Sequence, residues 1–73
     1  MSRLGNISGT DAVKAFQKAG WQTVGQVGSH AVMSRPGVRV NLSIPLHKEL
    51  SVGTLRALIR NAGLSGEEFL KLL

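Results

Sequence analysis

The spacing of apolar residues changes twice along the chain, and this change limits the folds open to it. Near the start, apolar side chains recur at the spacing of one helix face: Ala12, Ala15, Phe16 and Ala19. Over residues 38–44 they alternate with polar residues, as in a strand with one buried face. A helical stripe returns with Leu55, Leu58, Ile59 and Ala62. The pattern predicts a helix, then strands, then a helix.

Capping residues set the limits of the predicted helices. Three serines occupy favourable N-cap positions: Ser8, Ser51 and Ser65. An acidic residue three positions later completes a capping-box pattern for the first and third: Asp11 and Glu68. Glycines supply the left-handed C′ position after the first and second helices: Gly20 and Gly63. We expect a short third helix that reaches Leu73.

Strands are predicted between the two long helices. Residues 21–27 mix aromatic, β-branched and polar side chains without a helical repeat, and residues 30–34 read as a second strand after the Gly28-Ser29 break. The turn residues Arg35-Pro36-Gly37 then lead into a third strand. Its alternation predicts which side chains face inward: Val38, Val40, Leu42 and Ile44. The same alternation predicts which face solvent, before Pro45 ends the strand: Arg39, Asn41 and Ser43.

These elements predict an α+β two-layer sandwich in a single domain over residues 1–73. The connections suit hairpins and leave no room for a parallel crossover, so we expect a three-stranded antiparallel sheet in the order α-β-β-β-α, plus the short C-terminal helix. The helices would cover one sheet face. The other face and the loops would remain available for a ligand.

The charge balance favours a polyanionic partner. Nine Lys and Arg stand against four Asp and Glu, a formal net charge of +5 on 73 residues. A positive field of this kind on a small body attracts nucleic acid first.

Other features exclude several classes of site. There is no cysteine, which excludes disulfides and thiolate zinc sites. The His, Asp and Glu residues are scattered, so we expect no metal and no cofactor. No apolar run approaches the roughly 20 residues of a membrane span, and no signal peptide is recognisable. We expect a cytoplasmic protein without a membrane partner.

His30 is the strongest candidate for chemistry. Gly28 and Ser29 form a small, flexible turn that would present its imidazole at a strand edge, close to a phosphate. Histidine titrates near neutral pH and serves as general acid or base. The ordinary alternative is a partly exposed histidine without a role. A Ser29–His30 nucleophile pair is disfavoured, because adjacent strand residues point to opposite faces.

Other polar residues are weaker candidates. His47 offers a second imidazole that could divide the acid and base roles with His30, although a local backbone bond explains it more simply. Five cations are candidate phosphate contacts, with a solvated basic surface as the alternative: Arg35, Arg39, Lys48, Arg56 and Arg60. Trp21 is expected to anchor packing rather than to stack a base.

Several segments share their order and spacing with a known family: Ser8-Gly9, Lys18-Ala19-Gly20-Trp21, Gly28-Ser29-His30, Ile44-Pro45, His47-Lys48-Glu49-Leu50, Gly53-Thr54-Leu55-Arg56, Ala62-Gly63-Leu64-Ser65 and Glu67-Glu68-Phe69-Leu70. Across nearly the whole chain, the sequence therefore resembles the HicA-type (YcfA-like) toxins of toxin–antitoxin systems. It departs from them at residues 31–33, where the family often carries an aromatic residue or a second histidine.

The resemblance implies a double-stranded-RNA-binding-domain-like fold and a ribosome-independent mRNA interferase activity, with His30 at the position of the catalytic histidine. It also implies RNA as substrate and a HicB-type antitoxin as inhibitory partner. Two alternatives remain open. The first is a non-catalytic module that binds double-stranded RNA by shape. The second is a component that mainly docks an acidic protein.

Overall fold

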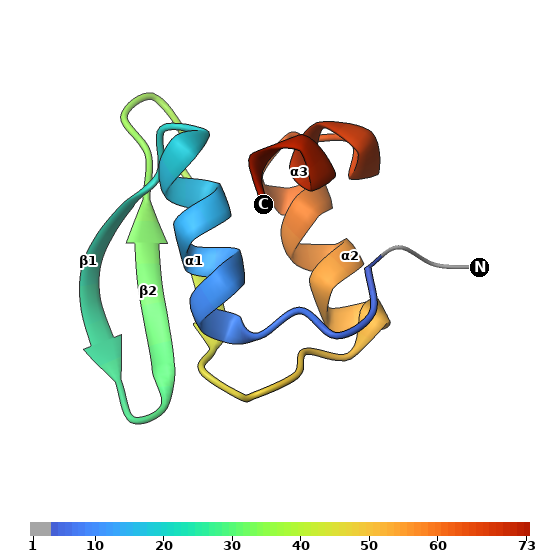
Figure 1. Ribbon diagram of the computed structural model, residues 1–73. Helices are drawn as coiled ribbons and strands as arrows, with labels where there is room; N and C mark the ends of the chain where they lie inside the picture. The colour runs from blue at the N-terminus through green and yellow to red at the C-terminus, as the bar shows by residue number, and fades with distance from the viewer. Residues whose placement is uncertain (1–3) are drawn as a thin grey trace.

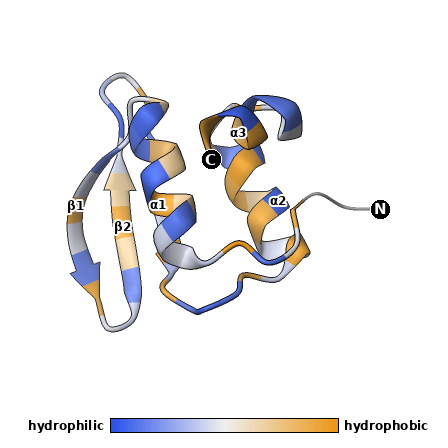
Figure 2. Cartoon of the chain, in the orientation of Figure 1, coloured by the Kyte–Doolittle hydropathy of each residue, from blue (hydrophilic) through white to orange (hydrophobic). Residues whose placement is uncertain are grey.

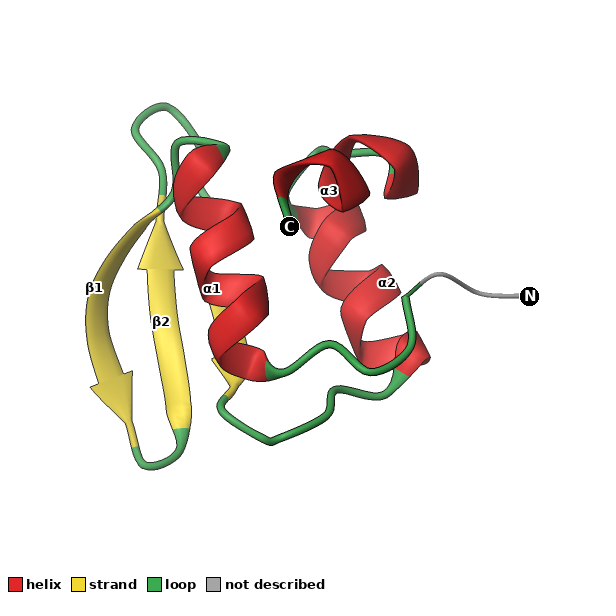
Figure 3. Ribbon diagram, in the orientation of Figure 1, coloured by secondary structure: helices red, strands yellow, loops and turns green. Residues whose placement is uncertain are grey.

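The structure, a computed structural model, describes residues 4–73. Its elements follow one another in this order (Figure 1): α1 (Gly9–Lys18), β1 (Gln22–Val27), β2 (His30–Ser34), β3 (Leu42–Pro45), α2 (Val52–Asn61) and α3 (Gly66–Leu72). This order confirms the predicted α+β arrangement. In Figure 3, α1 lies against the sheet and α2 stands beside α1, with α3 folded across the upper part of the helical layer.

The helix ends follow the predicted capping. The Ser8 hydroxyl accepts a hydrogen bond from the Asp11 backbone N–H, and the Asp11 carboxylate accepts one from the Ser8 N–H, which completes the box. Ser65 and Glu68 form the same reciprocal pair at α3. Beyond α1 and α2, two glycines adopt the expected left-handed conformation: Gly20 at φ 98° and Gly63 at φ 76°.

The sheet has three antiparallel strands in the order β1-β2-β3. Ala31 and Met33 of β2 are buried, whereas His30 is exposed. Since neighbouring strand residues point to opposite faces, Ala31 and Met33 lie under the helices and His30 lies on the uncovered face. We call this uncovered side the open face. The register between β1 and β2 shifts between Thr23 and Gly25, a bulge that interrupts the edge strand.

The core lies between the sheet and the helices. Its largest fully buried side chains are Trp21, Phe16, Phe69, Met33, Leu42, Ile44, Leu50 and Leu55. The Phe16 and Phe69 rings meet with centroids 5.1 Å apart, so α3 is tied to α1 through an aromatic contact. Trp21 is 1 % exposed, which confirms it as a packing anchor. Along the helices in Figure 2, hydrophobic and hydrophilic residues share the same turns, as amphipathic packing requires.

The predicted start of the third strand is wrong, and so is the inward placement of Val38 and Val40, whereas Leu42 and Ile44 are buried as predicted. β3 begins only at Leu42, and Val38 and Val40 are 36 % and 52 % exposed instead of buried. The Val38 N–H donates to the Arg35 carbonyl at 3.0 Å, and Gly37 has φ 83°, so a tight turn takes residues 35–38 out of the ladder. The chain then runs in an irregular loop until Leu42 pairs with Met33. Of the polar residues assigned to this strand, Ser43 alone lies within β3, and Arg39 and Asn41 are exposed in the loop.

Candidate active site

His30 lies where the β1–β2 hairpin turn meets β2. Gly28 adopts φ 59°, a left-handed conformation that glycine tolerates, and Ser29 completes the two-residue turn. His30 is the first residue of β2 and is exposed on the open face. The imidazole is therefore accessible to a large substrate, as the sequence predicts. The structure places Gly28 and Ser29 beside it.

A second imidazole lies close to the first. His30 pairs with Pro45 across the β2–β3 ladder, and His47 follows two residues later on the same side of the chain. The ring centroids of His30 and His47 are 6.5 Å apart, with the rings inclined by 65°. Both residues are exposed. We call these two side chains the histidine pair.

Backbone hydrogen bonds hold the segment that carries His47. The Leu46 N–H donates to the Ser29 carbonyl at 2.7 Å, which continues the strand contact beyond β3. The His47 carbonyl accepts a hydrogen bond of 2.9 Å from the N–H of Gly9, the first residue of α1. His47 is therefore fixed from two sides, by the hairpin turn and by a helix end.

Gly9 makes this contact possible because it lacks a side chain. A Cβ atom at this position would overlap the Pro45 carbonyl oxygen and lie 2.8 Å from the Leu46 Cα atom. No real Cβ occupies such space without movement of the backbone. Gly9 could not be recognised as a site residue from the sequence, because nothing local in it marks a close approach between residues 36 positions apart.

The predicted phosphate contacts do not lie together. Lys48 follows His47 directly and is exposed at the same end of the sheet. Arg35 follows the opposite end of β2, about 16 Å from His30 at a strand rise of roughly 3.3 Å per residue. Its Nε atom lies 3.3 Å from where a Cβ on Gly20 would be, so its side chain lies over the α1–β1 turn. Arg39 is exposed in the loop before β3.

The remaining two predicted contacts belong to a different element. Arg56 and Arg60 are exposed on α2, one turn apart, while the adjacent Leu55 and Ile59 are buried in the core. Within residues 4–73, the structure thus brings the His30 and His47 rings together beside the Gly28-Ser29 turn, with Lys48 as the next residue along the chain. It leaves the four arginines distributed over the rest of the surface.

Exposed apolar side chains border the histidine pair. Val27 of β1 is the direct cross-strand partner of His30, so both side chains share the open face. Val27 is 71 % exposed, and Val24 beside the bulge is 58 % exposed. The sequence predicts no role for either valine. Val27 is exposed because its cross-strand pairing places it on the open face, which the residue pattern of β1 does not reveal.

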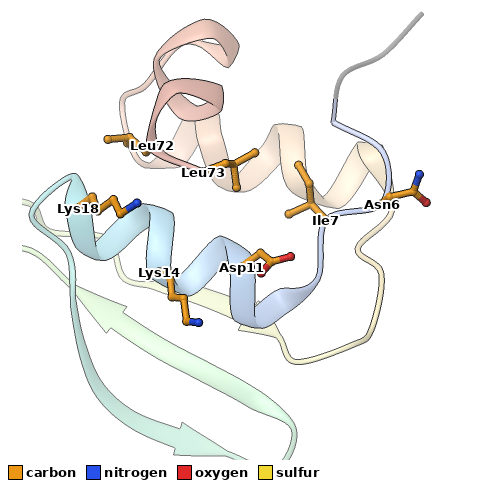
Figure 4. Close-up of a pocket in the computed structure, with 7 residues that line it drawn as sticks. All are labelled: Asn6, Ile7, Asp11, Lys14, Lys18, Leu72 and Leu73. Atoms are coloured by element: carbon orange, nitrogen blue, oxygen red, sulfur yellow. The ribbon is translucent and has the colours of Figure 1, made fainter.

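A groove of about 380 Å³ lies elsewhere, between α1 and the end of α3. Ile7, Leu72 and Leu73 give it an apolar lining, and Lys14 and Lys18 of α1 stand along it (Figure 4). Neither histidine lines this groove. The candidate active site therefore lies apart from this groove, on the open face of the sheet.

Groups of three or more possible metal-ligating side chains do not occur among residues 4–73. Over the same residues, none of the helices combines the length and apolar character that crossing a bilayer requires.

Fold and site together define a small basic α+β protein that presents two imidazoles on an uncovered sheet. A family model described as the HicA toxin of bacterial toxin–antitoxin systems matches residues 9–64. This match covers most of the chain and includes Gly9, His30 and His47, and the chain belongs to the HicA toxin family. A comparison with curated proteins finds no match.

Proposed function

We propose that this toxin is a metal-independent endoribonuclease, an mRNA interferase, in which His30 is the catalytic general acid/base. The observation that carries the proposal is the exposure of His30 on the open face, at a turn that places glycine and a hydroxyl beside it. A polynucleotide needs an accessible surface of this kind because it cannot enter a closed pocket. Membership of a toxin family supplies the biological context.

The proposed reaction is an attack by RNA on its own backbone. His30 removes the proton from a ribose 2′-hydroxyl, and the 2′ oxygen forms a bond to the adjacent phosphorus. The bond from phosphorus to the 5′ oxygen then breaks. The products are a 2′,3′-cyclic phosphate and a 5′-hydroxyl end. Lys48, next to the histidine pair, would offset the charge that grows on the phosphoryl oxygens.

The test is induced expression of the parent and of His30→Ala, scored for growth and for the integrity of total mRNA. The parent is expected to stop growth and to degrade mRNA, whereas His30→Ala does neither. Because His30 is exposed, the variant should keep the folded structure of the parent, which circular dichroism and RNA binding check. If His30→Ala is as toxic as the parent, the proposed role of His30 is wrong.

An RNA cleavage assay with purified protein distinguishes the enzyme from the non-catalytic alternative. The parent is expected to cleave RNA in the presence of EDTA and to leave cyclic phosphate ends. A parent that binds RNA and leaves it intact would instead be a double-stranded-RNA-binding module, for which the basic charge would suffice.

We further propose a HicB-type antitoxin as the partner and the cytoplasm, where mRNA is available, as the site of action. The toxin family implies an antitoxin in general. Val27, exposed beside His30, offers apolar area to such a partner, and the net charge of +5 favours an acidic one. A partner bound there would cover the histidine pair and stop cleavage.

A further inference from the structure

We propose that His47 is a second catalytic residue, the general acid that protonates the leaving 5′ oxygen while His30 acts as the general base. This inference rests on the proposed ribonuclease function and refines it from one histidine to two. Its basis is the position of the two rings, which are far apart in the sequence and adjacent on the open face.

The reaction itself requires proton transfer at two places. The attacking 2′ oxygen loses a proton on one side of the phosphorus atom, and the leaving 5′ oxygen gains one on the opposite side. A general acid or base must come within about 2.6–3.2 Å of its own oxygen. A single ring beside one oxygen does not reach the other in the same geometry. Two separate proton-transfer groups therefore serve the reaction better than one.

The spacing of the histidine pair suits this task. Centroids 6.5 Å apart keep the two rings separate, so a phosphodiester that lies over the pair on the open face can place its attacking and leaving oxygens beside different rings. Because the ring planes are inclined by 65°, the in-plane hydrogen-bonding directions of the two imidazoles differ, so the rings can serve two different oxygens. Both rings are exposed, and RNA can reach them from the open face.

Backbone contacts fix the positions from which the two histidine side chains branch. His30 is fixed in the β2–β3 ladder opposite Pro45, and the Leu46 N–H binds the Ser29 carbonyl. The N–H of Gly9 binds the His47 carbonyl itself. The segment is held again at its far end, where the Leu50 N–H donates to the Ile7 carbonyl at 2.7 Å. A fixed backbone limits the positions that the two rings can take, which favours catalysis by two positioned groups.

The proton balance closes without a further reactant. Neutral His30 takes the 2′-hydroxyl proton as the bond from the 2′ oxygen to phosphorus forms. Protonated His47 gives its proton to the 5′ oxygen as the bond from that oxygen to phosphorus breaks. After the reaction His30 is protonated and His47 is neutral, and exchange with water restores the starting states.

The decisive experiment compares two leaving groups. The parent protein is first used to find a cleavage site in an RNA oligonucleotide. The same oligonucleotide is then made with sulfur in place of the 5′ bridging oxygen at that site. A thiolate leaves without being protonated, so cleavage of this substrate does not need a general acid. Rates are measured for the parent, His30→Ala, His47→Ala, His47→Gln and, as a control on an exposed position of α2, Asn61→Ala.

We expect both His47 variants to slow cleavage of ordinary RNA by about 10²–10⁴-fold, the usual contribution of a general acid. On the sulfur substrate the same variants should be within about tenfold of the parent. His30→Ala should slow both substrates by about 10²–10⁴-fold, since the 2′-hydroxyl must lose its proton in either case. Asn61→Ala should match the parent on both.

Three results would overturn the inference. If His47→Ala slows both substrates equally, His47 only positions the substrate or the chain. If it slows neither, His47 takes no part in the reaction. Either result leaves the proposed function intact, because His30→Ala is still inactive. A parent that cuts neither substrate overturns the proposed function, and the inference with it.

Discussion

At the scale of single residues, Gly9 controls the geometry of the candidate site without belonging to it. A methyl group at this position would overlap the Pro45 carbonyl oxygen, so Gly9→Ala must push α1 away from the segment that carries His47. We expect overpacking to cost about 1–3 kcal/mol of unfolding free energy. For a domain of this size each kcal/mol lowers Tm by roughly 4–8 °C, which thermal unfolding measures.

Gly53 provides the matched control for Gly9. It lies in the first turn of α2, is exposed, and has open space where a Cβ would be. Gly53→Ala should leave stability unchanged or raise it by up to about 1 kcal/mol, because alanine loses less backbone entropy in a helix. Equal stability of Gly9→Ala and Gly53→Ala would show that the contact between α1 and Pro45 is not tight.

At the scale of elements, what could be predicted depended on how local the determining interactions are. The ends of all three helices followed from serines, acidic residues and glycines within a few positions of each other. The third strand did not, because its pairing depends on where β2 ends. Val38 and Val40 alternate as strand residues do, yet the turn at residues 35–38 carries them beyond the helices that would bury them.

In the candidate site, too, the features set by local interactions could be predicted and those set by distant contacts could not. The Gly28-Ser29 turn and the exposure of His30 are local properties, and the sequence predicted them. The nearness of His30 and His47 depends on strand register and on the contact of α1 with the end of β3, neither of which a linear pattern contains. From the sequence alone, a local backbone bond is therefore the simpler explanation of His47. The structure places its ring 6.5 Å from that of His30.

Helix α3 should be sensitive to acid through its capping box. The hydrogen bonds from the Ser65 backbone N–H and from its side chain, followed by the charge of Lys71, lower the pKa of Glu68 below its ordinary value. A lowered folded-state pKa adds stability above the unfolded-state pKa. That stability is lost as pH falls through the lowered value, below the ordinary glutamate range near pH ~4.3.

The measurement is Tm against pH for the parent, Glu68→Gln and Glu67→Gln. Glu68→Gln should reduce the fall in Tm on acidification, since glutamine has no proton to take up. Glu67, in the same turn, is not the residue that closes the box with Ser65, and Glu67→Gln should follow the parent. Identical pH profiles for the parent and Glu68→Gln would contradict the role given to the capping box.

At the scale of the whole molecule, the helical layer and the sheet face that it covers provide stability, and the uncovered sheet face is available for recognition. The helices cover one sheet face and bury nearly all large apolar side chains there, while the open face carries the histidine pair and Val27. The β1–β2 turn and the loop before β3 extend from opposite ends of β2 (Figure 1). A protein that inhibits the toxin by covering the histidines must therefore contact Val27, and it can leave Val40 uncovered.

This arrangement predicts how the proposed HicB-type antitoxin changes the stability of the toxin. A partner that binds only the folded state, at about 100 times its Kd, adds about 2.7 kcal/mol, or on the order of 10–20 °C in Tm for a domain of this size. Val27→Asp should lose this increase, because it removes apolar contact and sets a carboxylate against an acidic partner. Val40→Asp, at a site 52 % exposed in the loop before β3, should retain it. Differential scanning fluorimetry measures the Tm of each variant alone and with the antitoxin. Equal increases in Tm for both variants would place the antitoxin away from the histidine pair.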